Sequence, residues 1–255
     1  MTKVSLKGKI AVVTGSTKGI GFAISKEFAE NNGVTVIVCS RSIQKAEKAA
    51  QQINGKAFAA EIDITSNSSV KRFLQKVLSN YRRIDILINN AGYPFNSNIW
   101  SKKFHKVTDE ELDKIIEVDL KGSVRLSKAV INHMLKNEIK GVIINISSTP
   151  AIVGHIQGAP YTLAKASLIA LTKHIAMEYG SNNIRAYTLA LGNIATEATF
   201  NSMSQEDRKM ASEEASMKRW GKPEEVAKAA ACIASCNFSF ATGNTIVIDG
   251  GTVLL

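Results

Sequence analysis

The feature that most constrains the fold is a repeated alternation of short, β-branched apolar runs with longer segments of helical spacing. The apolar runs predict strands at Lys9–Thr14, Val34–Cys39, Ala57–Ala60, Ile84–Ile88, Val142–Ile146, Ile184–Leu189 and Thr245–Ile248. Runs that lack polar alternation are typical of strands buried on both faces. Strands that alternate with helices require right-handed crossovers, so the sequence predicts a doubly wound α/β fold with a parallel sheet and helices on both faces.

The helical segments are predicted at Ile20–Glu30, Gln44–Ile53, Val70–Leu78, Tyr161–Glu178 and Pro223–Ala234, and a further long helix is predicted to begin near Asp109. A chain of 255 residues, 45% of them hydrophobic, is long enough to bury one large core. No linker rich in Pro, Gly or Ser divides it. We therefore expect a single domain over residues 1–255, with a lid or substrate segment at about 194–217.

Composition disfavours several classes of function. The net charge is +10, but the basic residues are dispersed, which argues against a nucleic-acid surface and leaves a field that favours phosphorylated ligands. Three cysteines do not suggest a disulfide framework, and Cys232 and Cys236 have no histidine near them for a metal site. No signal peptide and no apolar stretch of about 20 residues is present, so we expect a cytoplasmic protein with no membrane contact.

A glycine-rich turn follows the first predicted strand, with the sequence TGSTKGIG at residues 14–21. The glycines allow a tight turn, and the helix that begins near Gly19 directs free N–H groups and its positive end towards a pyrophosphate. Strand, turn, helix and second strand follow one another in order. The chain is therefore predicted to bind a dinucleotide at a Rossmann-type sheet edge.

The spacing G-x-x-x-G-x-G resembles that of the short-chain dehydrogenase/reductase family. The resemblance extends along nearly the whole chain through Asp63-Ile64-Thr65, Asn89-Asn90-Ala91-Gly92, Ser148, Tyr161 with Lys165, Met217–Val226 and Thr242–Gly251. Within the family, 3-oxoacyl thioester reductases and sugar dehydrogenases look most similar. The resemblance implies a nicotinamide-dependent oxidoreductase whose cofactor contacts come from Gly15, Ser16, Thr17, Lys18, Gly19, Ile20, Gly21, Asp63, Ile64, Asn90, Ala91, Gly92, Gly192, Ile194 and Thr196.

The end of the second predicted strand indicates which nicotinamide cofactor is preferred. An acidic residue there would bind the ribose hydroxyls and repel a 2′-phosphate, but the chain has Cys39, Ser40 and Arg41. Arg41 can form a fork to phosphate oxygens, and Lys18 adds a second positive charge. We expect NADP(H) to be preferred, with NAD(H) as the alternative.

Tyr161 and Lys165 are four residues apart and share one face of a predicted helix. A phenol has an ordinary pKa of about 10, whereas proton transfer at neutral pH favours a value near 7. One ammonium at about 4 Å, at an effective dielectric constant of about 20, contributes about 4 kcal/mol, which is sufficient for that change. The resemblance implies that Tyr161 is the proton donor, that Lys165 lowers its pKa and binds ribose, and that Ser148 polarises the carbonyl. Ser147 is the second choice for that serine.

The chain departs from the family's pattern at two positions. In the segment Val118–Gly122 (VDLKG), Asp119 stands where the family has a catalytic asparagine. An ionised carboxylate only accepts hydrogen bonds, although it could still hold a water near Lys165. Leu191 precedes Gly192 where the family usually has proline. The resemblance implies Asp119 as a fourth catalytic residue, with a carboxylate in place of the family's amide.

The substrate pocket is expected to be apolar to mixed, which suits a ketone or a 3-oxoacyl group. Phe95, Trp100 and Phe104 lie in a long segment after the NNAG motif, where they could line the mouth of the pocket, pack onto a neighbour or anchor the segment, and we rank anchoring first. An acidic carrier protein would dock on basic residues at the ends of the two long helices. Those ends carry Glu138 and Asn182 instead. A coenzyme A thioester or a free ketone is therefore at least as well supported. The resemblance implies a homotetramer, with apolar surface offered by Leu112, Ile115, Ile116, Leu168 and Ile169.

The sequence as a whole favours an NADPH-dependent carbonyl reductase. A sugar, polyol or secondary-alcohol dehydrogenase is the alternative in the same class, and Lys18 and Arg41 favour the reductive direction. A non-catalytic nucleotide-sensing or scaffold protein has support only from Asp119 and Leu191.

Overall fold

The β-branched runs form one parallel sheet, as the sequence predicts. The computed structural model describes residues 6–197, 199–201 and 203–254. Its seven strands lie in the order β3-β2-β1-β4-β5-β6-β7, and every neighbouring pair is parallel. The strands are β1 (Ile10–Val13), β2 (Thr35–Ser40), β3 (Ala57–Glu61), β4 (Ile86–Asn89), β5 (Val142–Ser148), β6 (Arg185–Leu191) and β7 (Thr245–Ile248). The strand order reverses between β1 and β4, which is where such sheets bind their ligands.

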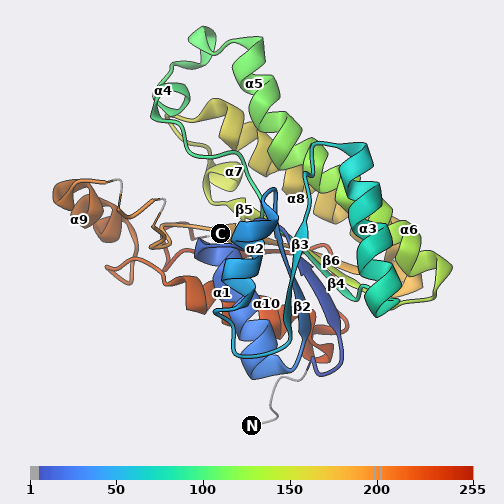
Figure 1. Cartoon of the computed structure of the whole chain (residues 1–255). Coiled ribbons are helices and arrows are strands. Elements are labelled where there is room, and N and C mark those ends of the chain that lie inside the picture. The colour runs from blue at the N-terminus through green and yellow to red at the C-terminus, as the bar shows by residue number, and fades with distance from the viewer. Residues whose placement is uncertain (1–5, 198, 202, 255) are drawn as a thin grey trace.

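Helices cover both faces of the sheet (Figure 1). One face is covered by α1 (Gly19–Lys26), α2 (Ile43–Ala50) and α10 (Pro223–Ala234), and the other by α3 (Asn67–Tyr81), α6 (Ser123–Lys136) and α8 (Ala159–Tyr179). The remaining helices are α4 (Ser97–Trp100), α5 (Asp109–Ile116), α7 (Pro150–Val153) and α9 (Gln205–Glu214). The predicted doubly wound Rossmann-type fold is confirmed.

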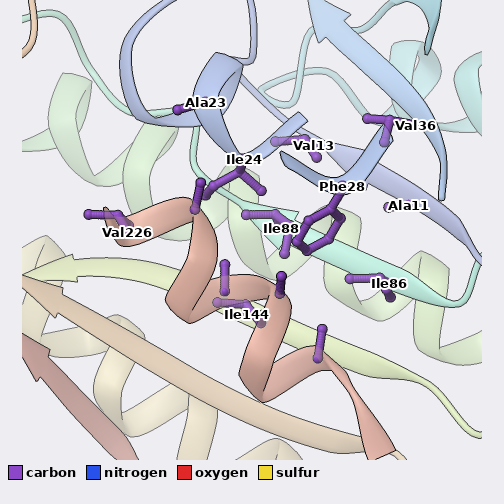
Figure 2. Packing of buried hydrophobic residues seen from close by; sticks show 14 of the residues in the cluster. Ala11, Val13, Ala23, Ile24, Phe28, Val36, Ile86, Ile88, Ile144 and Val226 are labelled. Atoms are coloured by element: carbon purple, nitrogen blue, oxygen red, sulfur yellow. The ribbon is translucent and has the colours of Figure 1, made fainter. Parts of the chain in front are cut away.

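Alternate residues of the strands supply two separate cores. Val13 and Ile88 point to the face covered by α1 and α10, where they pack with Ile24, Phe28 and Val226 (Figure 2). The intervening strand residues pack under α3, α6 and α8 instead. Because both faces are apolar, the strands carry no polar alternation, which explains the pattern seen in the sequence.

The long helix predicted from Asp109 is interrupted. After α5 the chain forms a π-helical turn at Glu117–Gly122 before α6 begins. At Gly122 the backbone lies so close to Ile64 that a Cβ atom would stand 2.7 Å from its Cδ1 atom. A π-helical turn rotates the residues that follow it, and such turns are frequent at functional sites. The helix predicted over Ile20–Glu30 likewise ends as a π-helical turn, at Glu27–Asn31.

The proposed lid contains a helix that the sequence did not predict, because α9 has only one buried residue, Ala211. Two of the residues expected to offer a tetramer face are instead buried within the chain. Ile115 is 6% exposed and Leu168 is 1% exposed, so neither is available to a second subunit. In the described ranges, no helix has both the length and the apolar character needed to cross a membrane.

Candidate active site

The glycine turn packs directly against the end of β4. Gly15 and Gly19 have φ angles of +61° and +58°, a conformation that glycine adopts without strain. A Cβ atom on Gly15 would lie 2.9 Å from the Cα of Ala91, and one on Gly21 would lie 2.4 Å from Nδ2 of Asn90. The turn therefore needs glycine at these positions for close packing of the chain itself.

Three side chains hold this turn in place. The amide of Asn90 donates to the carbonyls of Thr14 and Gly15 at 2.9 and 3.0 Å, and Oγ1 of Thr14 accepts the N–H groups of Asn90 and Ala91. The buried hydroxyl of Ser16 donates to the carbonyl of Val13 and accepts the N–H of Cys39. The side chains of Ser16 and Asn90 thus position the turn, and Thr14 is a third member of this group that the sequence did not single out.

The two cations predicted to select NADP lie at the same edge of the sheet. Lys18 precedes α1 and Arg41 follows β2, and both are exposed. Within the described part of the chain, neither side chain forms a hydrogen bond or an ion pair. The ammonium group of Lys18 and the guanidinium group of Arg41 are therefore available to an anion.

Asp63, one of the predicted cofactor contacts, follows β3, and one of its carboxylate oxygens accepts hydrogen bonds from a neighbouring residue. Its Oδ1 accepts both the hydroxyl and the N–H of Thr65, at 2.7 and 2.9 Å. The hydroxyl hydrogen bond, together with the attraction of Arg41 and Arg125, holds the pKa of Asp63 below its ordinary value. Arg125 also donates to the carbonyl of Ile64, which ties this loop to α6.

The nicotinamide end predicted after β6 lies beside the glycine turn. A Cβ atom on Gly19 would stand 3.6 Å from Thr196, so the two ends of the predicted cofactor site meet. The backbone of Gly192 lies close to Asp249. A Cβ atom on Gly192 would stand 2.5 Å from the Cβ of Asp249, so this position has no room for a side chain. The N–H of Ile194 makes no hydrogen bond within the residues that the structure describes, which leaves it free to donate to a ligand.

Tyr161 and Lys165 lie on one face of α8, as predicted from their spacing. Nζ of Lys165 is 5.6 Å from the centre of the Tyr161 ring and donates to the carbonyl of Ile146 in β5 at 3.3 Å. The phenol hydroxyl makes no hydrogen bond to any described residue. It is therefore available to a substrate oxygen.

Asp119 forms a buried ion pair with Lys165, at 3.1 Å between Oδ2 and Nζ. Its other oxygen accepts the N–H of Tyr93 at 2.5 Å. Burial alone lowers the pKa of Lys165, but the attraction of Asp119, then that of Tyr161, and the hydrogen bond to Asp119 outweigh it, so the pKa lies above its ordinary value. Lys165 thus remains an ammonium through neutral pH.

The two serines at the end of β5 occupy different environments. Ser147 is buried and donates to the carbonyl of Lys165 at 2.8 Å, so it joins β5 to α8. Ser148 is half-buried and donates to the carbonyl of Leu191 at 3.1 Å. Only Ser148 is partly open to solvent, which agrees with the preference for it from the sequence.

A chain of buried polar side chains lies beneath these residues. Nδ2 of Asn89 donates to Ser127 and to Asn145, at 2.9 and 2.8 Å. Asn145 donates in turn to Thr172, which also accepts the hydroxyl of Thr188. This network joins β4, β5 and β6 to α6 and α8, so it fixes the helix that carries Tyr161 against the sheet.

Comparisons with known proteins cover nearly the full chain. A family model described as enoyl-(acyl carrier protein) reductase matches residues 15–253. Glucose 1-dehydrogenase 2 of Bacillus subtilis and the 3-oxoacyl-(acyl-carrier-protein) reductase FabG of Thermotoga maritima are each 34% identical over 252 residues. These alignments cover 98% of this chain, and 96% and 99% of the two relatives respectively.

A third relative, 3beta-hydroxysteroid dehydrogenase 1 of Eggerthella lenta, is 34% identical over 254 residues, which cover 98% of this chain and 95% of the relative. Among solved structures, that of 3-ketoacyl-(acyl-carrier-protein) reductase from Brucella melitensis, complexed with NADH, matches with a TM-score of 0.90 and 30% identity. The match covers 98% of this chain and 100% of the other. The likeness therefore includes the whole sheet and every segment described above.

Replacing Asp119 with asparagine tests whether its charge is required. The resembled family has asparagine there, and an amide retains one of the two contacts that the carboxylate makes. We expect Asp119→Asn to keep at least about half of the wild-type kcat at neutral pH. Asp113→Asn, an exposed change on α5, is the control. A collapse of kcat in Asp119→Asn alone would show that the carboxylate itself is needed.

Proposed function

The chain belongs to the short-chain dehydrogenase/reductase family of oxidoreductases, and from this membership we propose that it is an NADPH-dependent carbonyl reductase. The observation that supports the proposal is that Nζ of Lys165 lies 5.6 Å from the centre of the Tyr161 ring and donates to Ile146 in β5, the strand that ends at Ser148. The glycine turn and the free N–H of Ile194 lie at the same sheet edge. A hydride donor and a proton donor can therefore serve one substrate there.

The residues at the sheet edge fit a nicotinamide dinucleotide. The N–H groups in the first turn of α1 have no partner within the helix and suit a pyrophosphate. Lys18 and Arg41 suit a 2′-phosphate, which supports NADP over NAD. When bound, the reduced cofactor supplies two electrons and a hydrogen as hydride to the carbonyl carbon.

The protein's own side chains supply the proton. The hydroxyl of Tyr161 donates its proton to the carbonyl oxygen as the hydride reaches the carbon, which converts the ketone into a secondary alcohol. The ammonium of Lys165 stabilises the phenolate that is left, until solvent returns the proton. The hydroxyl of Ser148 turns from the carbonyl of Leu191 to the same substrate oxygen, where it stabilises the developing negative charge.

The substrate proposed is a ketone or a coenzyme A-type 3-oxoacyl thioester. The names of the three relatives refer to a sugar, a steroid and an acyl-carrier substrate. Their sequence identities to this chain are nearly equal, so sequence similarity does not favour one of these substrates over the others. Glu138 and Asn182, just past the ends of α6 and α8, are not basic residues of the kind that an acidic carrier would pair with, although Lys136 ends α6. We place the reaction in the cytoplasm.

We also propose a homotetramer. A groove between α6 and α8 is lined by Ile131, Leu135 and Leu171, and Leu135 is 37% exposed. Of the residues predicted to offer a contact face, Leu112, Ile116 and Ile169 remain half-buried and support this assembly.

The reaction is tested by following NADPH oxidation with a panel of ketones, diketones and acetoacetyl-coenzyme A. We expect turnover with at least one of them, and a fall of at least about 100-fold in kcat for Tyr161→Phe, because general acid catalysis contributes about that much. Tyr179→Phe, at the far end of α8, is the control. Binding of NADPH without oxidation of it by any compound would instead support a nucleotide sensor or scaffold.

Cofactor selection is tested with Arg41→Ala. Loss of a charged hydrogen bond to the 2′-phosphate should raise KM for NADPH about tenfold, equivalent to about 1.4 kcal/mol, and leave KM for NADH unchanged. Arg72→Ala, an exposed change on α3, should alter neither value. An unchanged ratio of kcat/KM for NADPH and NADH in Arg41→Ala would show the assignment to be wrong.

A further inference from the structure

Trp100 ends α4, a short helix that is firmly anchored in the segment between β4 and α5. Oδ1 of Asn96 accepts the N–H groups of Asn98 and Ile99 and so caps the helix. The side chain of Ile99 is 7% exposed and packs with Ile115 and Ala164. The position of Trp100, the next residue, is therefore set by a buried neighbour.

The indole of Trp100 meets the proposed proton donor. Its ring lies edge-on to that of Tyr161, with 5.7 Å between the centres and an angle of 64°. Its Nε1 donates to Oε1 of Gln157 at 3.0 Å, and its carbonyl accepts the N–H of Gly158 at 2.9 Å. Side chain and backbone of Trp100 are thus both tied to the segment that leads into α8.

Gly158 provides the space that the indole needs. Its φ angle is +70°, and a Cβ atom there would stand 2.4 Å from both Cε3 and Cζ3 of Trp100. Gly158 immediately precedes α8, which carries Tyr161 in its first turn. Any side chain at this position would displace the indole from the tyrosine.

Two further aromatic rings extend this surface. Phe95 lies 5.9 Å and His155 lies 5.3 Å from the indole, measured between ring centres. Phe95 is 59% exposed, so its ring is still open to a ligand. Gln157 engages the indole N–H and, through its own N–H, Nδ1 of His155. With these polar atoms occupied, the surface presents mainly ring faces.

We propose that Trp100, Phe95 and His155 form an aromatic wall beside Tyr161 that selects ketones whose larger substituent is planar and apolar, such as an aryl or fused-ring group. The inference rests on the proposed carbonyl reductase function and names its substrate class. Aromatic rings favour offset or edge contacts with another ring beyond the burial of area alone. A polyhydroxylated sugar would lose its hydration at such a wall without gaining hydrogen bonds.

The experiment compares an aryl ketone (propiophenone) with an open-chain ketone of similar hydrophobicity (2-octanone) as substrates with NADPH. We expect wild type to have the higher kcat/KM for propiophenone. Trp100→Leu should lower that value at least about tenfold and alter the value for 2-octanone by less than about threefold. Trp100→Phe, which keeps a ring, should recover most of the loss. Phe104→Ala is the control, because Phe104 lies in the same segment and is 74% exposed.

Equal losses for both ketones in Trp100→Leu would overturn the proposal, because they would show that the indole merely supports Tyr161. A wild type that reduces both ketones without preferring propiophenone would overturn it as well.

A binding measurement separates this inference from the proposed reaction. The chain has two tryptophans, so Trp220→Phe leaves Trp100 as the single one. Propiophenone, added with oxidised NADP, should quench its fluorescence saturably, and 2-octanone should not. If wild type reduces neither ketone, the proposed carbonyl reductase function fails for these compounds. The fluorescence quench by propiophenone then tests the aromatic wall by itself. Absence of a saturable quench by propiophenone would overturn the wall whatever the activity.

Discussion

The buried ion pair between Lys165 and Asp119 is the interaction on which the geometry of the site depends. It joins α8 to the π-helical turn after α5, and each partner makes one further hydrogen bond, Lys165 to Ile146 in β5 and Asp119 to Tyr93 after β4. Two ions this deeply buried lose most of their hydration, which costs several kcal/mol unless the remaining polar atoms are satisfied. Here both partners are satisfied by backbone groups, so the pair fixes four segments around Tyr161 at once.

The pair also limits how strongly Lys165 acts on Tyr161. An ammonium alone at about 4 Å would stabilise a phenolate by about 4 kcal/mol at an effective dielectric constant of about 20. The carboxylate of Asp119, 3.1 Å from that ammonium, opposes this stabilisation because its charge has the opposite sign. The ammonium is nevertheless held charged, since Asp119 raises the pKa of Lys165 against its burial. Lys165 therefore presents a weaker but lasting positive charge to Tyr161.

Local sequence patterns predicted the strands, the main helices and the order of the motifs, because periodicity and the conformational demands of glycine are properties of short segments. The contacts that organise the site depend on residues distant in the chain. At the π-helical turn Gly122 lies against Ile64, and the indole of Trp100, which contacts Tyr161, lies against Gly158. Both of these glycines were visible in the sequence, but no local pattern showed which side chains they would admit. The expectation that Phe104 anchors its segment was wrong, since that ring is exposed.

The most direct test of the role of Asp119 is the pKa of Lys165 itself, followed by an NMR titration of its side chain in wild type and in Asp119→Asn. Burial lowers the pKa of Lys165, and the charge and hydrogen bond of Asp119, with the contribution of Tyr161, outweigh it. Without the carboxylate, the pKa of Lys165 falls and its charge is lost at a lower pH as the pH rises. The titration midpoint of Lys165 in Asp119→Asn should therefore lie at least about one pH unit below that in wild type. Superimposable titrations, or a midpoint displaced to higher pH, would contradict the assignment of Asp119 as the group that keeps Lys165 charged.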